Sequence, residues 1–106
     1  MAEIVEMIAR RWHGRVPCEK TAEYMQLMAQ VGLPDYRSTL GNRGAWCLFR
    51  RDNGIAHFEM FTLWDDFGAI RRFAGEDINK AKYYDFDPEF LLELEPSVVH
   101  FEVIEG

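Results

Sequence analysis

Arg10 is the first side chain of this sequence whose type and setting could do chemistry. It shares one side of an alternating segment with Ile8 and Trp12. An arginine among apolar neighbours could bind a carboxylate or stabilise an oxyanion. The alternative is structural: an ion pair with an acidic residue such as Glu76 or Asp77, because an unpaired buried charge is strongly destabilising. Both interpretations predict a partner for this guanidinium.

Three histidines, His13, His57 and His100, are the candidates for proton transfer, because imidazole changes its charge near neutral pH. All three fall on segments with the alternation of β-strands, where a histidine more often has a structural role. His57 is expected in a polar network with Arg50 and Glu59. His13 stands where its strand ends, and it is the candidate general base.

The two cysteines, Cys18 and Cys47, cannot form a disulfide framework, and no Cys-x-x-Cys or His-x-x-x-His spacing is present. We therefore expect no metal site. The first seven residues contain two glutamates and no apolar region typical of a secretion signal. No apolar run reaches the roughly 18 residues that a membrane span needs. The sequence predicts a cytoplasmic protein with free thiols and no membrane partner.

The composition predicts one globular domain over residues 1–106, since 48% of the residues are hydrophobic and 28% are charged. Twelve basic and 18 acidic residues give a formal net charge of −6. A protein that binds nucleic acid needs a positive surface for the phosphates. We therefore expect no nucleic-acid partner.

The candidate residues are positioned by a predicted series of strands and helices. Alternation, helical spacing and turn residues predict a strand over 5–13 ended by Gly14 and a helix over 17–31 ended by Gly32 and Pro34. A hairpin of strands 44–51 and 55–64 is expected next, followed by a helix from Asp65 or Asp66 to Gly75. Further helical pieces over 76–84 and from Asp87 lead to a last strand over 97–104. The order β-α-β-β-α-β is that of the ferredoxin-like α+β fold, a four-stranded antiparallel sheet with helices on one face.

The Asn53-Gly54 pair predicts a two-residue hairpin turn and so fixes the register of its strands. Counting outward, Trp46 lies opposite Phe61, and the two faces of the sheet separate. The face that the helices should cover carries Ile8, Phe49, Phe58, Met60, Val99 and Phe101. The open face carries Trp46, Leu48, Phe61, His57 and His100. Large exposed aromatic groups usually mark an interface, so we expect a homodimer through the open face.

The strand that ends in Phe61-Thr62-Leu63-Trp64, with the capped helix that follows at Asp65-Asp66-Phe67 and the later 77–83 segment, resembles the antibiotic biosynthesis monooxygenase family. This family belongs to the dimeric α/β barrel proteins. The resemblance extends over nearly the whole domain. Its most specific element is the tryptophan at the end of the third strand.

The resemblance implies a pocket between the helices and the sheet that holds a small aromatic or quinol molecule. Monooxygenases of the family work without a cofactor, because the deprotonated substrate itself reduces dioxygen. The implied donors to the substrate are Arg10, Trp64 and Tyr83, with His13 as the base. The implied wall of the pocket consists of Ile8, Trp12, Phe49, Phe58, Met60 and Thr62.

Two other functions stay open at this point. One is a non-catalytic dimeric module whose pocket binds a small molecule or is filled by side chains. The other is haem binding or haem degradation, which in this family uses an asparagine, a tryptophan and an axial histidine. Trp64 matches the tryptophan, while Arg10 and Tyr83 stand at the other two positions, and a phenolate can also bind haem iron.

Overall fold

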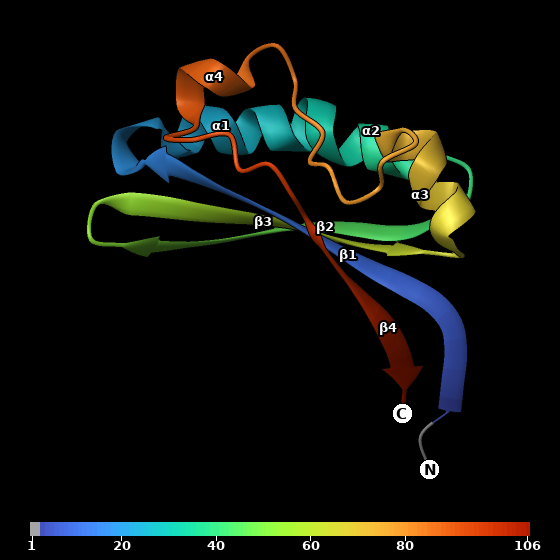
Figure 1. The fold of residues 1–106 in the computed structure, drawn as a ribbon. Helices are drawn as coiled ribbons and strands as arrows, with labels where there is room; N and C mark the ends of the chain where they lie inside the picture. Colours follow the sequence, from blue (N-terminus) through green and yellow to red (C-terminus); the bar gives the residue numbers. More distant parts are fainter. Residues whose placement is uncertain (1–2) are drawn as a thin grey trace.

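The computed structural model describes the backbone of residues 3–106 and the side chains of residues 6–106. Its four strands form one antiparallel sheet in the order β2-β3-β1-β4, with the helices on one face (Figure 1). The strands are β1 (Glu3–Pro17), β2 (Asn42–Asp52), β3 (Ile55–Trp64) and β4 (Val99–Glu105). The expected ferredoxin-like α+β fold is confirmed. No helix in this described part is long and apolar enough to cross a lipid bilayer.

The β2–β3 hairpin has the predicted register. Trp46 pairs with Phe61, Phe49 with Phe58, and the turn residues Asn53 and Gly54 both have positive φ angles, 50° and 76°. Two positive φ angles are what a type I′ turn requires, and its twist matches that of the strands. The short-range pattern was therefore enough to place this half of the sheet.

Strand β1 does not end at Gly14, as the sequence suggested, but runs on to Pro17. Gly14 pairs with Phe58, and the ring of Trp12 crosses over it. A Cβ atom at residue 14 would lie 2.6 Å from Cη2 of Trp12. The glycine therefore marks a close approach of a ring to the backbone, which is a common reason for glycine inside a strand.

The prediction that Gly32 and Pro34 end the first helix is wrong. A 3-10 turn (Cys18–Lys20) leads into α1 (Thr21–Leu27), a π turn (Met28–Gly32) and α2 (Leu33–Ser38) in one continuous rod. Pro34 lies in the first turn of α2, where its missing N–H is tolerated, and Gly32 keeps a helical φ of −61°. The rod therefore carries Asp35 and Tyr36 onto the sheet.

The second helical region is shorter than predicted. Helix α3 (Phe67–Ala74) is capped by Asp66, whose carboxylate accepts from the N–H of Ala69 at 2.8 Å, and it ends at Gly75. The piece expected to be helical over 76–84 is extended instead, because its backbone bonds to residues 96–98 through Ala81 N to Pro96 O and Val98 N to Asn79 O. We call residues 76–98 the strap. It includes the short α4 (Asp87–Phe90), which lies beside α1, and it returns to the edge of the sheet (Figure 1).

Strand β4 presents the opposite faces to those expected. Val99 pairs with Arg11 and Phe101 with Ala9, while His100 pairs with Arg10. Directly paired residues share a face, so Val99 and Phe101 lie on the open face and His100 on the covered face. Val99, Phe101 and Val103 make one side of β4 apolar, but the strand extends beyond the helices with β1 (Figure 1), and this apolar side faces away from them. Its pattern therefore did not reveal which side is covered.

We expect Gly41→Ala to destabilise the protein more than Gly75→Ala. Both glycines have a φ of +94°, which costs an alanine about 1–3 kcal/mol. A Cβ at residue 41 would also clash with the Cβ of Ala69, whereas nothing lies within 4 Å of one at residue 75. The clash adds about 1–3 kcal/mol. Urea denaturation of both variants measures the difference, and equal losses would contradict the close approach.

Candidate functional site

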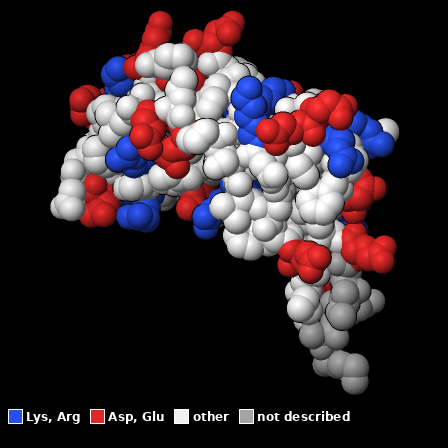
Figure 2. All heavy atoms as spheres, in the orientation of Figure 1, with Lys and Arg blue, Asp and Glu red and all other residues white. Residues whose placement is uncertain are grey.

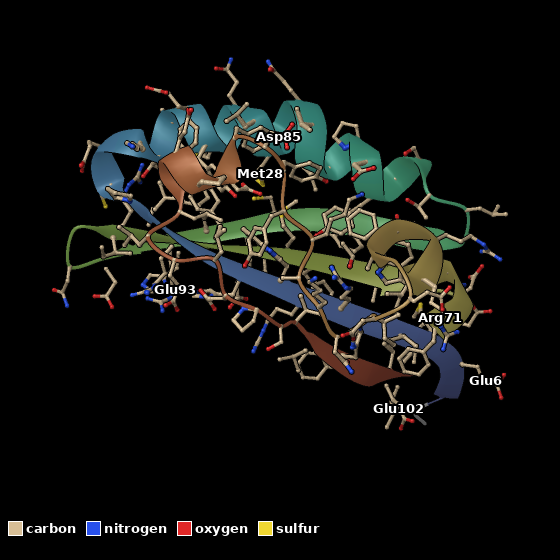
Figure 3. The ribbon with its side chains drawn as sticks, turned by 45° about the horizontal axis from the view of Figure 1, so that its top comes forward. Glu6, Met28, Arg71, Asp85, Glu93 and Glu102 are labelled. Atoms are coloured by element: carbon tan, nitrogen blue, oxygen red, sulfur yellow. The ribbon has the colours of Figure 1, made fainter. Side chains whose placement is uncertain are left out.

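Side chains occupy the space between the helices and the sheet (Figure 3). A cavity of about 10 Å³ lies among them, which is room for about one water molecule. Its lining comes from β1, α1, the π turn, α2, β3 and the strap. The lining residues are Trp12, Tyr24, Met28, Gly32, Tyr36, Met60, Lys82, Tyr84 and Asp87.

Two carboxylates attach the strap to the helices beside this cavity. Asp35 of α2 accepts from Lys82 Nζ at 2.8 Å and from the Tyr84 hydroxyl at 2.6 Å. Asp87 accepts from the Tyr24 hydroxyl and from the Tyr84 backbone N–H, both at 2.7 Å. The strap is therefore held to the helical layer by a few charge-assisted hydrogen bonds.

Burial determines the protonation of the polar groups around the cavity. Burial raises the pKa of Asp87, and it raises the pKa values of Tyr24 and Tyr84. It raises the pKa of Tyr36 to about 12, with Arg10 acting in the opposite direction. Partial burial opposes the ionisation of Asp35, but hydrogen bonds from Lys82 and Tyr84 lower its pKa. At neutral pH the tyrosines are therefore neutral hydrogen-bond donors.

Arg10 forms no ion pair with any of the side chains that the structure describes. It is 1% exposed, and among the described side chains no carboxylate lies within ion-pair distance, so the expected pair with Glu76 or Asp77 does not form. Its Nη2 donates to the Lys80 carbonyl at 3.3 Å, its Nε has no partner, and its guanidinium lies 5.5 Å from the centre of the Phe73 ring. Burial lowers the pKa of Arg10, while Tyr36 acts against this. The interior therefore contains a cation without a counter-charge.

Trp64 is fully buried, and its indole N–H already donates a hydrogen bond. That group donates to the Thr62 hydroxyl at 2.8 Å, which donates to the Arg10 carbonyl at 3.3 Å. Trp12 is also buried, but its Nε1 has no partner, and its ring makes an edge contact with Tyr83 at 6.1 Å between centroids. The unused indole donor on the cavity wall is therefore that of Trp12.

The predicted pocket residues divide between the cavity and the packed core. Trp12 and Met60 line the cavity. Phe58 and Thr62 are buried in the core, Ile8 is half-buried, and Phe49 is partly exposed and stacks on Phe58.

Of the polar cavity residues, sequence reasoning singled out Tyr84, as a phenol donor beside Tyr83, and it missed Tyr24, Tyr36, Lys82 and Asp87. Tyr24 was assigned only to an apolar helix face, Tyr36 fell in a predicted loop, and Lys82 and Tyr84 fell in a predicted helix. A signal was present in the four tyrosines of the chain, all of which lie in the two segments that face each other across the cavity.

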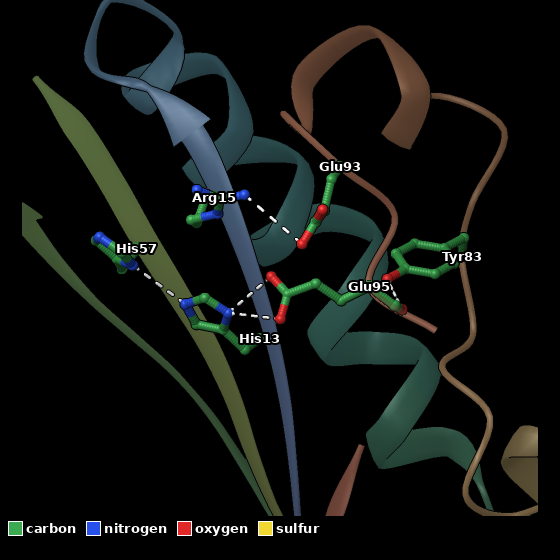
Figure 4. Close-up of polar contacts among 6 residues, drawn as sticks. All are labelled: His13, Arg15, His57, Tyr83, Glu93 and Glu95. Carbon is green, nitrogen blue, oxygen red and sulfur yellow. Dashed lines mark hydrogen bonds and ion pairs between the residues drawn. The ribbon is translucent and has the colours of Figure 1, made fainter. Parts of the chain in front are cut away.

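His13 lies on the opposite face of the sheet from Arg10, Trp12 and Trp64. On this open side its Nδ1 lies 2.8 and 2.9 Å from the two carboxylate oxygens of Glu95, and its Nε2 lies 3.1 Å from Nδ1 of His57 (Figure 4). Glu95 belongs to the strap, and its backbone carbonyl accepts from the Tyr83 hydroxyl. The structure therefore links Tyr83 to His13 through Glu95, but it does not bring His13 to the interior cavity.

Other charged groups of the described residues form no metal centre. No group of three or more His, Cys, Asp or Glu side chains in residues 6–106 is placed to hold a metal ion. Acidic and basic side chains alternate over the side seen in Figure 2. Burial, together with the charge of Arg10, lowers the pKa of His100 on the covered face.

Two solved structures share this fold over almost the whole chain. A protein from Shewanella oneidensis matches with a TM-score of 0.73 and 16% identity, covering 100% of both chains. A proposed antibiotic biosynthesis monooxygenase from Bacillus cereus matches with a TM-score of 0.63 and 10% identity, covering 95% of this chain and 98% of the other. No protein family model and no curated protein matches the sequence. At these identities the likeness shows the fold alone.

Proposed function

We propose that the chain is a cofactor-independent monooxygenase-like protein that acts on a small aromatic or quinol molecule between the helices and the sheet. The observation that carries the proposal is the unpaired buried cation Arg10 in an aromatic interior. Lys82 is neutralised by Asp35, and the Asp87 carboxylate is bonded to the Tyr24 hydroxyl and the Tyr84 backbone N–H, not to Arg10. An anionic substrate would supply the charge that this interior lacks.

The chemistry needs little from the protein beyond a proton acceptor and charge stabilisation. A methylene group flanked by aromatic rings loses a proton, and its electron pair stays on the carbon as a delocalised anion. This anion gives an electron to dioxygen, and the two radicals combine into a peroxide anion. The peroxide anion takes the proton back from the base, and loss of water, formed from its outer OH and the remaining hydrogen of the carbon, leaves a carbonyl. In the proposed site Asp87 accepts the proton and Arg10 stabilises the anion. The neutral N–H of Trp12 and O–H of Tyr36 donate hydrogen bonds to an oxygen atom of the substrate and so orient it.

Substrate entry requires the strap to move, since a cavity of about 10 Å³ cannot hold an aromatic ring. The contacts that attach the strap to α2 converge on one carboxylate, that of Asp35. Both partners of this ion pair are about one-third exposed, so water can replace their contacts. We propose that release of Lys82 and Tyr84 from Asp35 opens the interior.

We also propose that the open face of the sheet packs against a second copy of the chain. Trp46 and Leu48 are 49% and 50% exposed, and the ring of Trp46 lies 6.2 Å from that of Phe61. Val99 and Phe101, which the register of β4 places on this face, extend the apolar surface. His57 belongs to this face, whereas His100 does not.

The test of the proposed activity is oxygen uptake with a panel of anthrones and hydroquinones. We expect uptake with at least one compound. In Asp35→Ala the strap loses contacts worth about 1–2 kcal/mol, so kcat/KM should rise about tenfold. The matched control is Asp65→Ala, which removes another partly exposed carboxylate, paired with Arg43 at 3.6 Å away from the strap. Silence of both the wild type and Asp35→Ala across the panel would overturn the proposal.

A further inference from the structure

We propose that Glu95, His13 and His57 form a second proton-accepting site on the open face, in which Nε2 of His57 is the base and the adjacent hollow binds a small organic acid. This site lies on the opposite side of the sheet from the interior cavity, at the hairpin end of the face that we propose packs against a second copy, so the ligand binds the single chain and competes with that copy. It therefore stands independently of the proposed monooxygenase activity.

Glu95 determines which nitrogen atoms of the two imidazoles carry protons. A carboxylate only accepts hydrogen bonds, so His13 must donate from Nδ1 to Glu95. Nε2 of a neutral His13 is then an acceptor, and the contact at 3.1 Å requires His57 to donate from its own Nδ1. Nε2 of His57 is left with a free lone pair. One carboxylate thus sets the tautomer of both rings, in the way that an acidic group orients a catalytic histidine.

This arrangement transfers the role of base from His13 to His57. Both nitrogens of His13 are engaged, so it cannot take a proton from a ligand directly. It acts as a positioning residue between the carboxylate and His57. The rings of His13 and His57 are also stacked, with 5.4 Å between their centroids. This stacking helps to keep Nε2 of His13 close to Nδ1 of His57.

The position of Glu95 is itself fixed by the strap. Its carbonyl accepts from Tyr83, and the strap bonds to the edge of β1 through Leu92 N to Arg15 O at 2.9 Å. Arg15 also lies 3.6 Å from Glu93 (Figure 4). These contacts hold the strap against the edge of β1, so that the Glu95 carboxylate reaches the open face of the sheet.

His57 lines a hollow of about 220 Å³ together with Leu48, Phe49, Arg50 and Glu59. Arg50 is exposed, with only a loose contact of 3.6 Å to Asp52, and can bind an anionic group. Leu48 provides an apolar surface, while Glu59 disfavours a second negative charge. The ligand that fits is a small organic monoanion with one further weakly acidic proton.

The proposed step moves one proton from the ligand to the relay, by which we mean the hydrogen-bonded series Glu95, His13 and His57. The bond between the ligand and its acidic hydrogen breaks, the electron pair stays on the ligand, and the proton bonds to Nε2 of His57. The proton on Nδ1 of His57 is then drawn toward Nε2 of His13, and the negative charge of Glu95 stabilises the imidazolium. Arg50 lies beside the second negative charge that this leaves on the ligand, and it offsets the repulsion from Glu59.

The tautomers can be tested by long-range nitrogen–proton NMR of the histidine rings in the intact protein. We expect His57 to be protonated at Nδ1 and bare at Nε2. In Glu95→Ala the Nε2-protonated form of His57 should become populated. The matched control is Glu93→Ala, which removes the neighbouring carboxylate of the strap without touching a histidine. A wild-type His57 protonated at Nε2, or a tautomer unchanged in Glu95→Ala, would overturn the relay.

Binding can be tested with salicylate as the probe, because it is a monoanion with one further acidic proton. We expect the His57 ring signals to shift on titration, and we expect the apparent Kd to rise at least tenfold in Arg50→Met. Arg51→Met is the control, since Arg51 lies beside the same turn but does not line the hollow. Unchanged His57 signals with saturating salicylate, or equal effects of both substitutions, would overturn the ligand site.

Discussion

Trp64→Ala is expected to lower the free energy of unfolding by about 3–5 kcal/mol, as large-to-small substitutions of buried aromatic residues do. Trp64 is completely buried, and its ring lies 6.3 Å from Tyr36 and 5.7 Å from Phe73. The substitution leaves a cavity and removes the donor to Thr62. Urea denaturation monitored by far-UV circular dichroism measures the loss.

Trp46→Ala is the matched control, because Trp46 belongs to the same sheet but faces outward. In dilute protein we expect its cost to stay below about 1 kcal/mol. At high concentration it should weaken the proposed dimer, and the dimer dissociation constant from analytical ultracentrifugation should rise at least tenfold. An equal loss of monomer stability in both variants would show that Trp46 is part of the core. A wild-type protein that stays monomeric at high concentration would contradict the dimer.

The parts of the fold that sequence predicts well are those governed by local rules. The hairpin around Asn53-Gly54 has the predicted register because a two-residue turn allows one twist and one alignment. Asp65 and Asp66 were both candidates for the helix cap from their position before an apolar stripe, and Asp66 is the one that caps α3. In both cases residues close in sequence supply all the interactions that decide the structure.

The parts that were predicted wrongly depend on distant partners. The strap has helical spacing in places, yet residues 79–81 take their backbone hydrogen bonds from residues 96–98. Similarly, Pro34 usually ends a helix, but here the preceding π turn lets it start a new turn of the same rod. Tertiary contacts outweigh such local preferences, and a single sequence does not reveal them.

The candidate site was predicted in its components but not in its arrangement. Arg10 and Trp12 were placed correctly on the covered face, since alternation along a strand fixes the face. His13 follows the same rule onto the open face, so its distance from Arg10 was already implied by the odd spacing of three residues. Its contact with Glu95 was not predictable, because 82 positions separate them in the chain.

The second large effect is expected for Arg10→Met, which should make the protein more stable and much less active. Removing a buried charge that has no ion-pair partner should raise the free energy of unfolding by about 1–2 kcal/mol. Loss of the positive charge that stabilises the substrate anion should lower kcat/KM for oxygen uptake by about 100- to 1,000-fold.

Arg11→Met is the matched control for this prediction. Arg11 is the next residue of β1 but lies on the open face, 5.7 Å from the ring of Phe101. We expect it to change neither stability nor oxygen uptake by more than about twofold. If Arg10→Met unfolds the protein instead, the guanidinium has a structural role through the Lys80 carbonyl. If it is more stable and equally active, the interior charge serves some purpose other than the oxidation. A buried charge kept at a cost in stability is expected only where function requires it, and the pair of measurements separates these cases.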